Sequence, residues 1–401
     1  MTPQATVDLA DLGLDEGGHI LLRRAMRSVP VGAAVAITGR DPHLAVHLRG
    51  FCRQEGHEVT WPDDASGTIF VHRGSAEEGR WRGSEQAGHT RRDEDGAVLD
   101  EPPAHWGLAA RGARVEAGGP AFDFRLDTKV ELWADEAARL YEQATAAQWD
   151  PATAIPWDTP VELAPEIEDA VVQIMTYLIE NETAALLVPA RFLAQIHPHF
   201  REIMQLLAVQ VADEARHIEV FTRRAQLCRS DLGLSTVGGQ ASLKTLVDEP
   251  DFALASFLLS VLGEGSFLSL LWFLHAHAPD PITKQVALLT AQDEARHVAF
   301  GLAHLARHAE LDPTMHARMR DAVHRRHDAL RDTAGLNELV FDALVVVAAG
   351  GYSPEALRHG YGAVVELKRD MDEGRRKRLI RLGFDEEEAA ALSSLHTRNF
   401  M

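Results

Sequence analysis

The pentapeptide Asp-Glu-Ala-Arg-His occurs twice, as Asp213–His217 and Asp293–His297. Each copy places a Glu and a His three positions apart, so both side chains lie on one face of an α-helix. A single copy would favour an exposed helix turn with local ion pairs. Two identical copies within long segments of helical periodicity instead favour a helical bundle with polar groups in its core.

A glutamate lies upstream of each copy, inside a segment of apolar residues. Glu182 precedes Glu214 by 32 residues and Glu264 precedes Glu294 by 30, so the unit is duplicated. Glu180 competes with Glu182, but its turn neighbours are more polar and we choose Glu182. At helical spacing Glu182 shares a face with Val171, Met175, Leu178, Ile179 and Leu186, and Glu264 shares one with Phe257, Val261, Phe267, Leu268 and Leu271.

Buried carboxylates need a compensating charge. Four carboxylates and two imidazoles would carry about −4, which two divalent cations would neutralise. Cys52 and Cys228 are the only cysteines, which excludes four-thiolate zinc and iron–sulfur sites. Carboxylates with imidazoles suit iron or manganese, and we predict two iron ions with manganese in reserve. The predicted ligands are Glu182, Glu214, His217, Glu264, Glu294 and His297.

Asp213 and Asp293 precede the ligating Glu by one residue and the His by four. A metal-bound His usually donates its second N–H to a carboxylate. We therefore expect these two aspartates to surround the metal ligands, with Arg216 and Arg296 balancing their charge.

The chain divides by pattern into three parts. Residues 1–75 alternate short helices and strands, as in a small α+β domain, and residues 76–128 form a polar linker. Residues 129–401 are almost entirely helical in pattern. The predicted helices are His19–Ser28, Asp41–Glu55, Lys129–Gln148, Glu166–Ile196, His199–Cys228, Phe252–His277, Pro281–Glu310 and Pro313–Ala334.

Composition limits the partners and the location. A formal charge of −20 over 401 residues disfavours nucleic acid. Phe252–Leu274 is long enough to span a bilayer, but Glu264 at its middle would be costly in lipid, which favours a buried bundle helix. The first 18 residues carry no secretory signal pattern, so we expect a cytoplasmic protein.

Residues 166–310 resemble the ferritin-like di-iron carboxylate oxidases and oxygenases. The resemblance rests on the DEARH segments and on Glu182-Thr183-Ala184-Ala185. It implies an all-α ferritin-like bundle in which a reduced di-iron centre activates O2 and oxidises a substrate in an adjacent apolar pocket. It also implies that the Asp of one helix orients the His of the other, that Glu264 and a partner carboxylate bridge the metals, and that Glu264 and Glu182 act in catalysis.

Three positions depart from the patterns of particular subfamilies. The radical tyrosine of ribonucleotide reductase small subunits is Phe221 here, the threonine of multicomponent hydrocarbon hydroxylases is Leu268, and the extra histidine of arylamine N-oxygenases is Thr290. None of these subfamilies is therefore assigned. We interpret five further histidines as capping, surface or packing residues: His197, His199, His275, His277 and His304.

The N-terminal part resembles the TusA/SirA sulfur-carrier family. The matching stretches include Leu12-Gly13-Leu14 and Gly50–Val59. The family's sulfur-carrying Cys would fall in Asp15–Gly18, where Glu16 forms no persulfide, and we interpret Cys52 as a small core residue. A role in docking, oligomerisation or lid formation is expected.

Together these patterns predict a non-haem di-iron oxidase or monooxygenase that acts with O2 on a small organic substrate, in bacterial specialised metabolism. No nucleotide-binding or CxxC motif occurs, so electrons would come from a separate reductase or ferredoxin or from the substrate. We expect no nucleic-acid or membrane partner, and a homodimer stays open. The alternatives are a ferritin-like iron-storage or peroxide-scavenging protein and a non-catalytic sulfur-relay partner.

Overall fold

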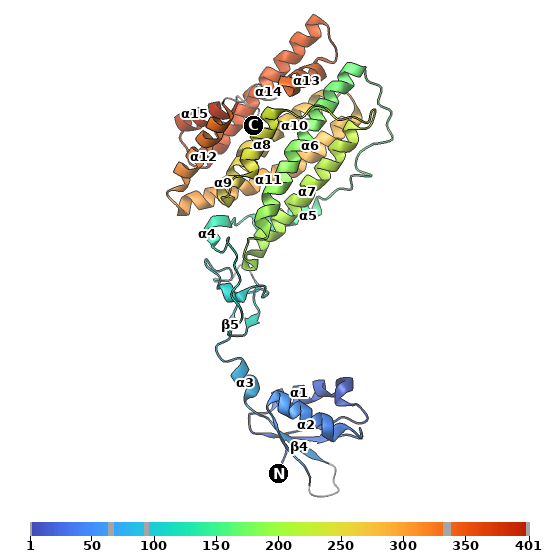
Figure 1. Ribbon diagram of the computed structural model, residues 1–401, viewed down its shortest axis with the longest axis vertical. Helices are drawn as coiled ribbons and strands as arrows, with labels where there is room; N and C mark the ends of the chain where they lie inside the picture. The colour runs from blue at the N-terminus through green and yellow to red at the C-terminus, as the bar shows by residue number, and fades with distance from the viewer. Residues whose placement is uncertain (1, 63–67, 92–95, 332–337, 398–401) are drawn as a thin grey trace. The chain divides into compact units, whose positions relative to one another are not determined.

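The computed structural model describes residues 2–62, 68–91, 96–331 and 338–397 (Figure 1). The chain forms two compact units. The first comprises residues 1–90 and 111–121, and the second comprises residues 91–110 and 122–401. The segment predicted as a linker, residues 76–128, is thus divided between the two units.

The N-terminal unit is a four-stranded mixed sheet with helices that pack on it. The strand order is β1-β2-β4-β3, with β1 parallel to β2 and the other pairs antiparallel. Cys52 is buried in the core between helices and sheet, and burial raises the pKa of its thiol to about 11. The elements are β1 (Ala5–Asp8), α1 (His19–Ser28), β2 (Ala34–Thr38), α2 (Leu44–Glu55), β3 (Glu58–Thr60) and β4 (Ile69–His72), with a π-helical turn at Leu14–Gly18.

Short elements follow this sheet in the sequence, before the long helices. They are α3 (Ala76–Arg80), β5 (Glu85–Gln86), β6 (Arg114–Val115) and a 3-10 turn at Ala104–Trp106. Strands β5 and β6 pair antiparallel within the first unit. The Leu99 N–H donates to His199 Nε2 at 2.9 Å within the second unit.

The second unit is a bundle of long helices (Figure 1). Helix α6 packs along α7, and α10 packs along α11, while α13 covers α6 and α14 covers α10. The predicted fold class, a small α+β domain followed by an all-α bundle, is confirmed. The helices are α4 (Lys129–Leu132), α5 (Ala137–Ala146), α6 (Pro165–Leu193), α7 (Arg201–Ala225), α8 (Val237–Val247), α9 (Phe252–Ser256), the π-helical η4 (Phe257–Glu264), α10 (Gly265–His277), α11 (Pro281–Leu311), α12 (Met315–Leu330), α13 (Glu338–Ala349), α14 (Pro354–Arg381) and α15 (Glu386–Thr397), with a 3-10 turn at Pro198–Phe200 before α7.

The helices differ from the prediction at two places, and one predicted helix end is untested. The single helix predicted over Lys129–Gln148 is broken, because Trp133 is extended and its indole N–H donates to Asp135. Helix α8 was not predicted, since its two glycines weaken the helical signal. The end of the predicted helix Pro313–Ala334 lies outside the described residues, and the rest is observed as α12.

Two helices, Pro165–Leu193 and Phe252–His277, are long and apolar enough to cross a membrane, and the bent pair α13–α14 would be a third. In the most apolar window of the first helix 67% of the residues are buried inside the protein, and in that of the second 83%. Packing within the bundle therefore accounts for the apolar composition of Phe252–Leu274.

Arg224 joins three of the bundle helices at one end. Its guanidinium is fully buried and binds both carboxylate oxygens of Glu168 on α6 at 2.8 and 2.9 Å. It also binds Asp280 at 2.8 Å and the hydroxyl of Thr283 at 2.7 Å. Asp280 accepts from the Thr283 N–H and so caps the N-terminus of α11. This network aligns α6, α7 and the start of α11.

Candidate metal centre

The six predicted ligands lie together in the bundle core. One group of carboxylate and imidazole atoms comprises Glu182, Glu214, His217 and Glu294, and a second comprises Glu214, Glu264, Glu294 and His297. Within each group the candidate ligand atoms are within 4.8 Å of one another. All six residues are at most 4% exposed. The duplication seen in the sequence therefore produces two adjoining sites.

Glu214 and Glu294 belong to both sites. The two oxygens of Glu214 lie 3.2 Å from His217 Nδ1 and 3.0 Å from His297 Nδ1. Each oxygen of Glu294 lies 3.5 Å from one of the same two nitrogens. Glu182 is 3.6 Å from His217 and belongs only to the first site. The carboxylates between the two histidines are those of the Glu-x-x-His motifs, and Glu264 belongs only to the second site; that Glu264 bridges the metals stays a prediction.

Glu264 belongs to the second site and lies in a π-helical segment, unlike the other ligands. It ends η4, in which the Gly265 N–H donates to the Ser260 carbonyl five residues earlier. Leu259 and Glu264, also five residues apart, both line a cavity beside the site. Of the face predicted for Glu264, Phe267 lines this cavity and Phe257 and Val261 do not, because a π turn brings residues at i and i+5 into line.

The aspartates of the two motifs hold the histidines across the helix pair. Asp293 on α11 accepts from His217 Nε2 on α7 at 3.2 Å. Asp213 on α7 accepts from His297 Nε2 on α11 at 3.3 Å. These bonds leave Nδ1 of each imidazole facing the carboxylates. Each histidine is thus oriented by the opposite helix, as the resemblance implied.

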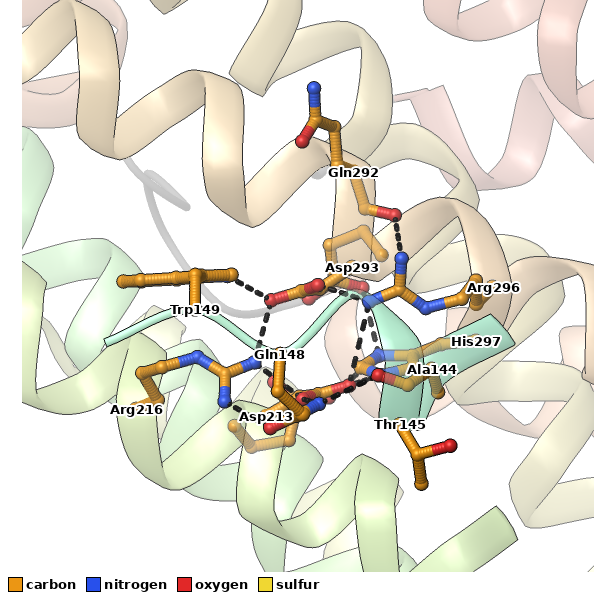
Figure 2. Close-up of polar contacts among 12 residues, drawn as sticks. Ala144, Thr145, Gln148, Trp149, Asp213, Arg216, Gln292, Asp293, Arg296 and His297 are labelled. Carbon is orange, nitrogen blue, oxygen red and sulfur yellow. Dashed lines mark hydrogen bonds and ion pairs between the residues drawn. The ribbon is translucent and has the colours of Figure 1, made fainter. Parts of the chain in front are cut away.

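Arginines and an aromatic segment cover the two aspartates (Figure 2). Arg216 Nη2 lies 2.5 Å from Asp213 and 2.8 Å from Asp293, while Arg296 pairs with Asp293. Gln148 donates to Asp213 at 2.9 Å, and the Trp149 indole N–H donates to Asp293 at 2.8 Å. The Arg216 guanidinium also lies 4.6 Å from the centre of the Trp149 ring.

Sequence reasoning assigned no role to three residues of this arrangement. Gln148 and Trp149 follow α5 in an irregular segment that is rich in tryptophan. This composition is the only feature of the sequence that marks them. Gln210 donates to Glu264 Oε1 at 3.2 Å. It lies one helical turn before Glu214 on α7, so helical spacing from a known ligand would have identified it.

The other candidates lie outside the centre. Glu180 is half-buried and lines a surface groove with α8, which supports the choice of Glu182.

The further histidines have other contacts. His197 Nδ1 accepts from the His199 N–H at the start of the turn before α7. His304 is fully buried against Phe252 and Phe300, and burial lowers its pKa to about 3. His275 Nδ1 lies 3.1 Å from the Lys284 carbonyl oxygen.

Burial and mutual charge set the protonation of the six ligands. Burial, and then the carboxylates of Glu214 and Glu294, raise the pKa of Glu182 well above that of an exposed glutamate. Burial raises the pKa of Glu264 in the same way. Burial opposes the charge on His217 and His297, but the surrounding carboxylates outweigh it and raise both pKa values. Without metal the cluster therefore holds protons that a cation would replace.

The donor set fits a pair of cations. Within the described structure, Glu182 Oε1 and Glu264 Oε2 are buried without a partner, and Glu214 Oε1, Glu294 Oε2 and His297 Nδ1 have only the contacts with one another given above. Such orphaned polar atoms are costly unless a ligand satisfies them. Four carboxylates and two imidazoles provide the oxygen and nitrogen donors that iron and manganese accept. A Glu from each of two helices and Glu-x-x-His from the other two is also the arrangement of ferritin-like di-metal carboxylate proteins.

A cavity of about 20 Å³ adjoins the two sites. This volume holds about one water-sized molecule. A second cavity of similar size lies beyond Leu259, which lines both, and includes Gln210 and Ser260. The lining of the first cavity is Asn181, Glu182, Ala185, Leu246, Leu259, Gly263, Glu264, Phe267 and Glu294.

No protein-family model and no curated protein matches this chain. Solved structures of R2-like ligand-binding oxidases are similar to it. One with an aerobically reconstituted Mn/Fe cofactor is 18% identical over 67% of this chain and 93% of its own, with a TM-score of 0.43. An R2-like ligand-binding oxidase from Sulfolobus acidocaldarius is 16% identical, over 63% of this chain and 93% of its own, with a TM-score of 0.41. Similarities at this level carry no argument about chemistry.

Proposed function

We propose that this protein is an O2-activating di-metal oxidase or monooxygenase with two iron ions, manganese being the alternative. The observation that carries the proposal is the buried donor set of Glu182, Glu214, Glu264, Glu294 and His297, in which one oxygen of Glu182 and one of Glu264 have no partner and the free oxygens of Glu214 and Glu294 face only His297 Nδ1. They face one another in a core that the bundle otherwise fills with apolar side chains. A solvated surface cluster of acids would not need such burial.

Each residue type has a distinct task in this centre. Glu214 and Glu294, which reach both histidines, would hold the two metals as a pair. Glu182 and Glu264 would each hold one metal and border the cavity. These two carboxylates are therefore the ligands placed to act next to a bound substrate.

The bound metals would supply one-electron chemistry and O2 activation, which no side chain provides. The protein orients the ligands through Asp213 and Asp293 and keeps bulk water out of the core. The cavity walls Ala185, Leu246, Leu259 and Phe267 are apolar. We therefore propose a small substrate whose reacting part is apolar, with electrons from a separate reductase or ferredoxin.

Stoichiometry and an oxygen reaction together test the proposal. Protein loaded anaerobically with Fe(II) should bind two ions per chain, and mixing with O2 should give a transient visible absorption. Apolar organic molecules that are substrates should accelerate its decay. Uptake of many irons per chain, with a slow ferric mineral and no effect of any organic molecule, would instead support iron storage. Metal-free protein of full stability that binds no iron would support a non-catalytic role.

A further inference from the structure

Glu264 is presented by a segment unlike those of the other ligands. Glu182, Glu214 and Glu294 stand within α-helices, whereas Glu264 is the last residue of the π-helical η4. Runs of π-helix are rare and occur mostly as single turns at functional sites. In an α-helix Glu264 and Leu259 would not share a face, so the position of Glu264 depends on the π turn being kept.

Arg378 on α14 contacts this turn at its backbone. Its Nε donates to the Val261 carbonyl at 2.7 Å. Its guanidinium also lies against Gly265, the residue after Glu264. A Cβ added to Gly265 would be 2.3 Å from Nε and 2.4 Å from Cζ of Arg378. Val261 and Gly265 are absent from the cavity lining, so Arg378 acts on the turn and not on a substrate.

The guanidinium of Arg378 is partly withdrawn from solvent on a half-buried side chain. In the part of the chain that the structure describes, no carboxylate pairs with Arg378, and its Nη2 is buried without a partner. Burial, and then the neighbouring Arg375, lower its pKa to about 9, so it is still a cation at neutral pH. A buried charge is unfavourable unless it is paired or hydrogen-bonded. The bond to the Val261 carbonyl satisfies the Nε of this cation.

We propose that Arg378 is a positioning residue for Glu264: by binding the Val261 carbonyl and covering Gly265, it holds the π turn that places Glu264 at the second metal position. This inference rests on the proposed di-metal function. It predicts an asymmetric defect. Loss of Arg378 should weaken the metal position made with Glu264 and His297 and leave that made with Glu182 and His217.

Metal binding by the full-length chain tests this asymmetry. In Arg378→Leu the second metal should bind about 10–100-fold more weakly, as expected when a residue that orients a ligand is removed. With Mn(II), the EPR signal of a coupled pair should give way to that of an isolated ion. Arg378→Lys, which retains one donor, should recover part of the affinity. Arg369→Leu is the matched control, because Arg369 is an exposed arginine of the same helix.

A second substitution tests the same contact from the other side. Gly265→Ala inserts a methyl group where the guanidinium lies and should also weaken the second metal position. In the double variant Gly265→Ala with Arg378→Leu, that methyl group meets no guanidinium, so the two losses should not multiply. Multiplying losses would show that the two residues act separately and would overturn the inference. If Arg378→Leu fails to fold by circular dichroism, Arg378→Lys and Gly265→Ala carry the test.

The outcomes separate this inference from the proposed function. If the unmodified protein binds two metals and Arg378→Leu binds both with unchanged affinity, the positioning role is wrong and the di-metal function stands. Equal weakening of both metal positions would also overturn the inference, since it would indicate a general loss of structure. If the unmodified protein binds no metal pair, the proposed function fails and this inference fails with it.

Discussion

At the scale of single residues, the centre is built by exchange between two helices. His217 on α7 is oriented by Asp293 on α11, and His297 on α11 is oriented by Asp213 on α7. Each imidazole is therefore correctly placed only when both helices are in register. Arg216 bonds to both aspartates and ties the two halves together.

Glutamates two positions apart on α6 give a direct test of the ligand assignment. Glu182→Gln should weaken metal binding at the first position, because an amide is a poorer ligand than a carboxylate. Glu180→Gln is the control and should leave two tight metals, since Glu180 lies at a surface groove. Calorimetric titration with Mn(II) measures both. The opposite result would move the ligand to Glu180.

Asp293 should affect metal affinity indirectly, by orienting His217, and not as a metal ligand. Asp293→Asn keeps the shape of the side chain but removes the carboxylate that accepts from His217, Arg216 and Trp149. We expect metal affinity to fall by about 10–100-fold. Asp321→Asn, at an exposed position of α12, serves as the control and should have no effect. An unchanged affinity in Asp293→Asn would show that this aspartate does not orient His217.

Metal binding should strengthen as the pH rises. The pKa values of His217 and His297 are raised, so both imidazoles hold protons at neutral pH in the metal-free centre, and the pKa values of Glu182 and Glu264 are raised as well. Bound cations require these groups deprotonated, so protons compete with metal and the competition weakens with increasing pH. Titrations between pH 6 and 8 should show tighter binding at pH 8, with proton release detectable in weak buffer. An affinity independent of pH would contradict these protonation states.

At the scale of elements, periodicity predicted the long helices well because each buries an apolar face against its neighbours. It failed where backbone hydrogen bonding departs from the α pattern. Within the π turn η4, Leu259 lines the cavity and Val261 does not. Nothing in the composition of Phe257–Glu264 reveals that arrangement, since all eight of its residues are buried.

The buried Arg224 network should contribute strongly to the stability of the helical unit. Arg224→Met leaves Glu168 and Asp280 buried without their cation, and we expect the free energy of unfolding to fall by about 3–5 kcal/mol. Arg229→Met removes a surface pair with Asp169 and should cost under about 1 kcal/mol. Urea denaturation of the two variants measures the difference. Equal small losses would show that the network is not a structural requirement.

At the scale of the whole molecule, the chain consists of two units that interleave in sequence. Residues 91–110 belong to the helical unit although they precede a segment of the N-terminal one. The Trp106 ring packs at 5.4 Å from His199, and the Leu99 N–H bonds to the same histidine. The resemblance of the N-terminal unit to sulfur carriers, and its role in docking or lid formation, stay predictions.

Shortened chains should therefore differ in stability according to where they begin. A chain that starts at residue 91 keeps the contacts of Leu99 and Trp106 with His199 and should bind two metals. A chain that starts at residue 122 loses them and should melt several degrees lower, as expected for about 1–2 kcal/mol in a domain of this size. Thermal melts followed by circular dichroism compare them. Equal melting temperatures would mean that residues 91–110 do not stabilise the bundle.

The sequence by itself determined the bundle, the six side chains at its centre and the aspartates beside them, because each follows from spacing along a single helix. Tertiary structure decided which carboxylates lie between the histidines, that Gln148, Trp149 and Gln210 belong to the arrangement, and that Glu264 depends on a π turn. These features arise from contacts between segments far apart in the chain, for which periodicity carries no signal. Arg378 is the clearest case, since its partner Val261 lies 117 residues away.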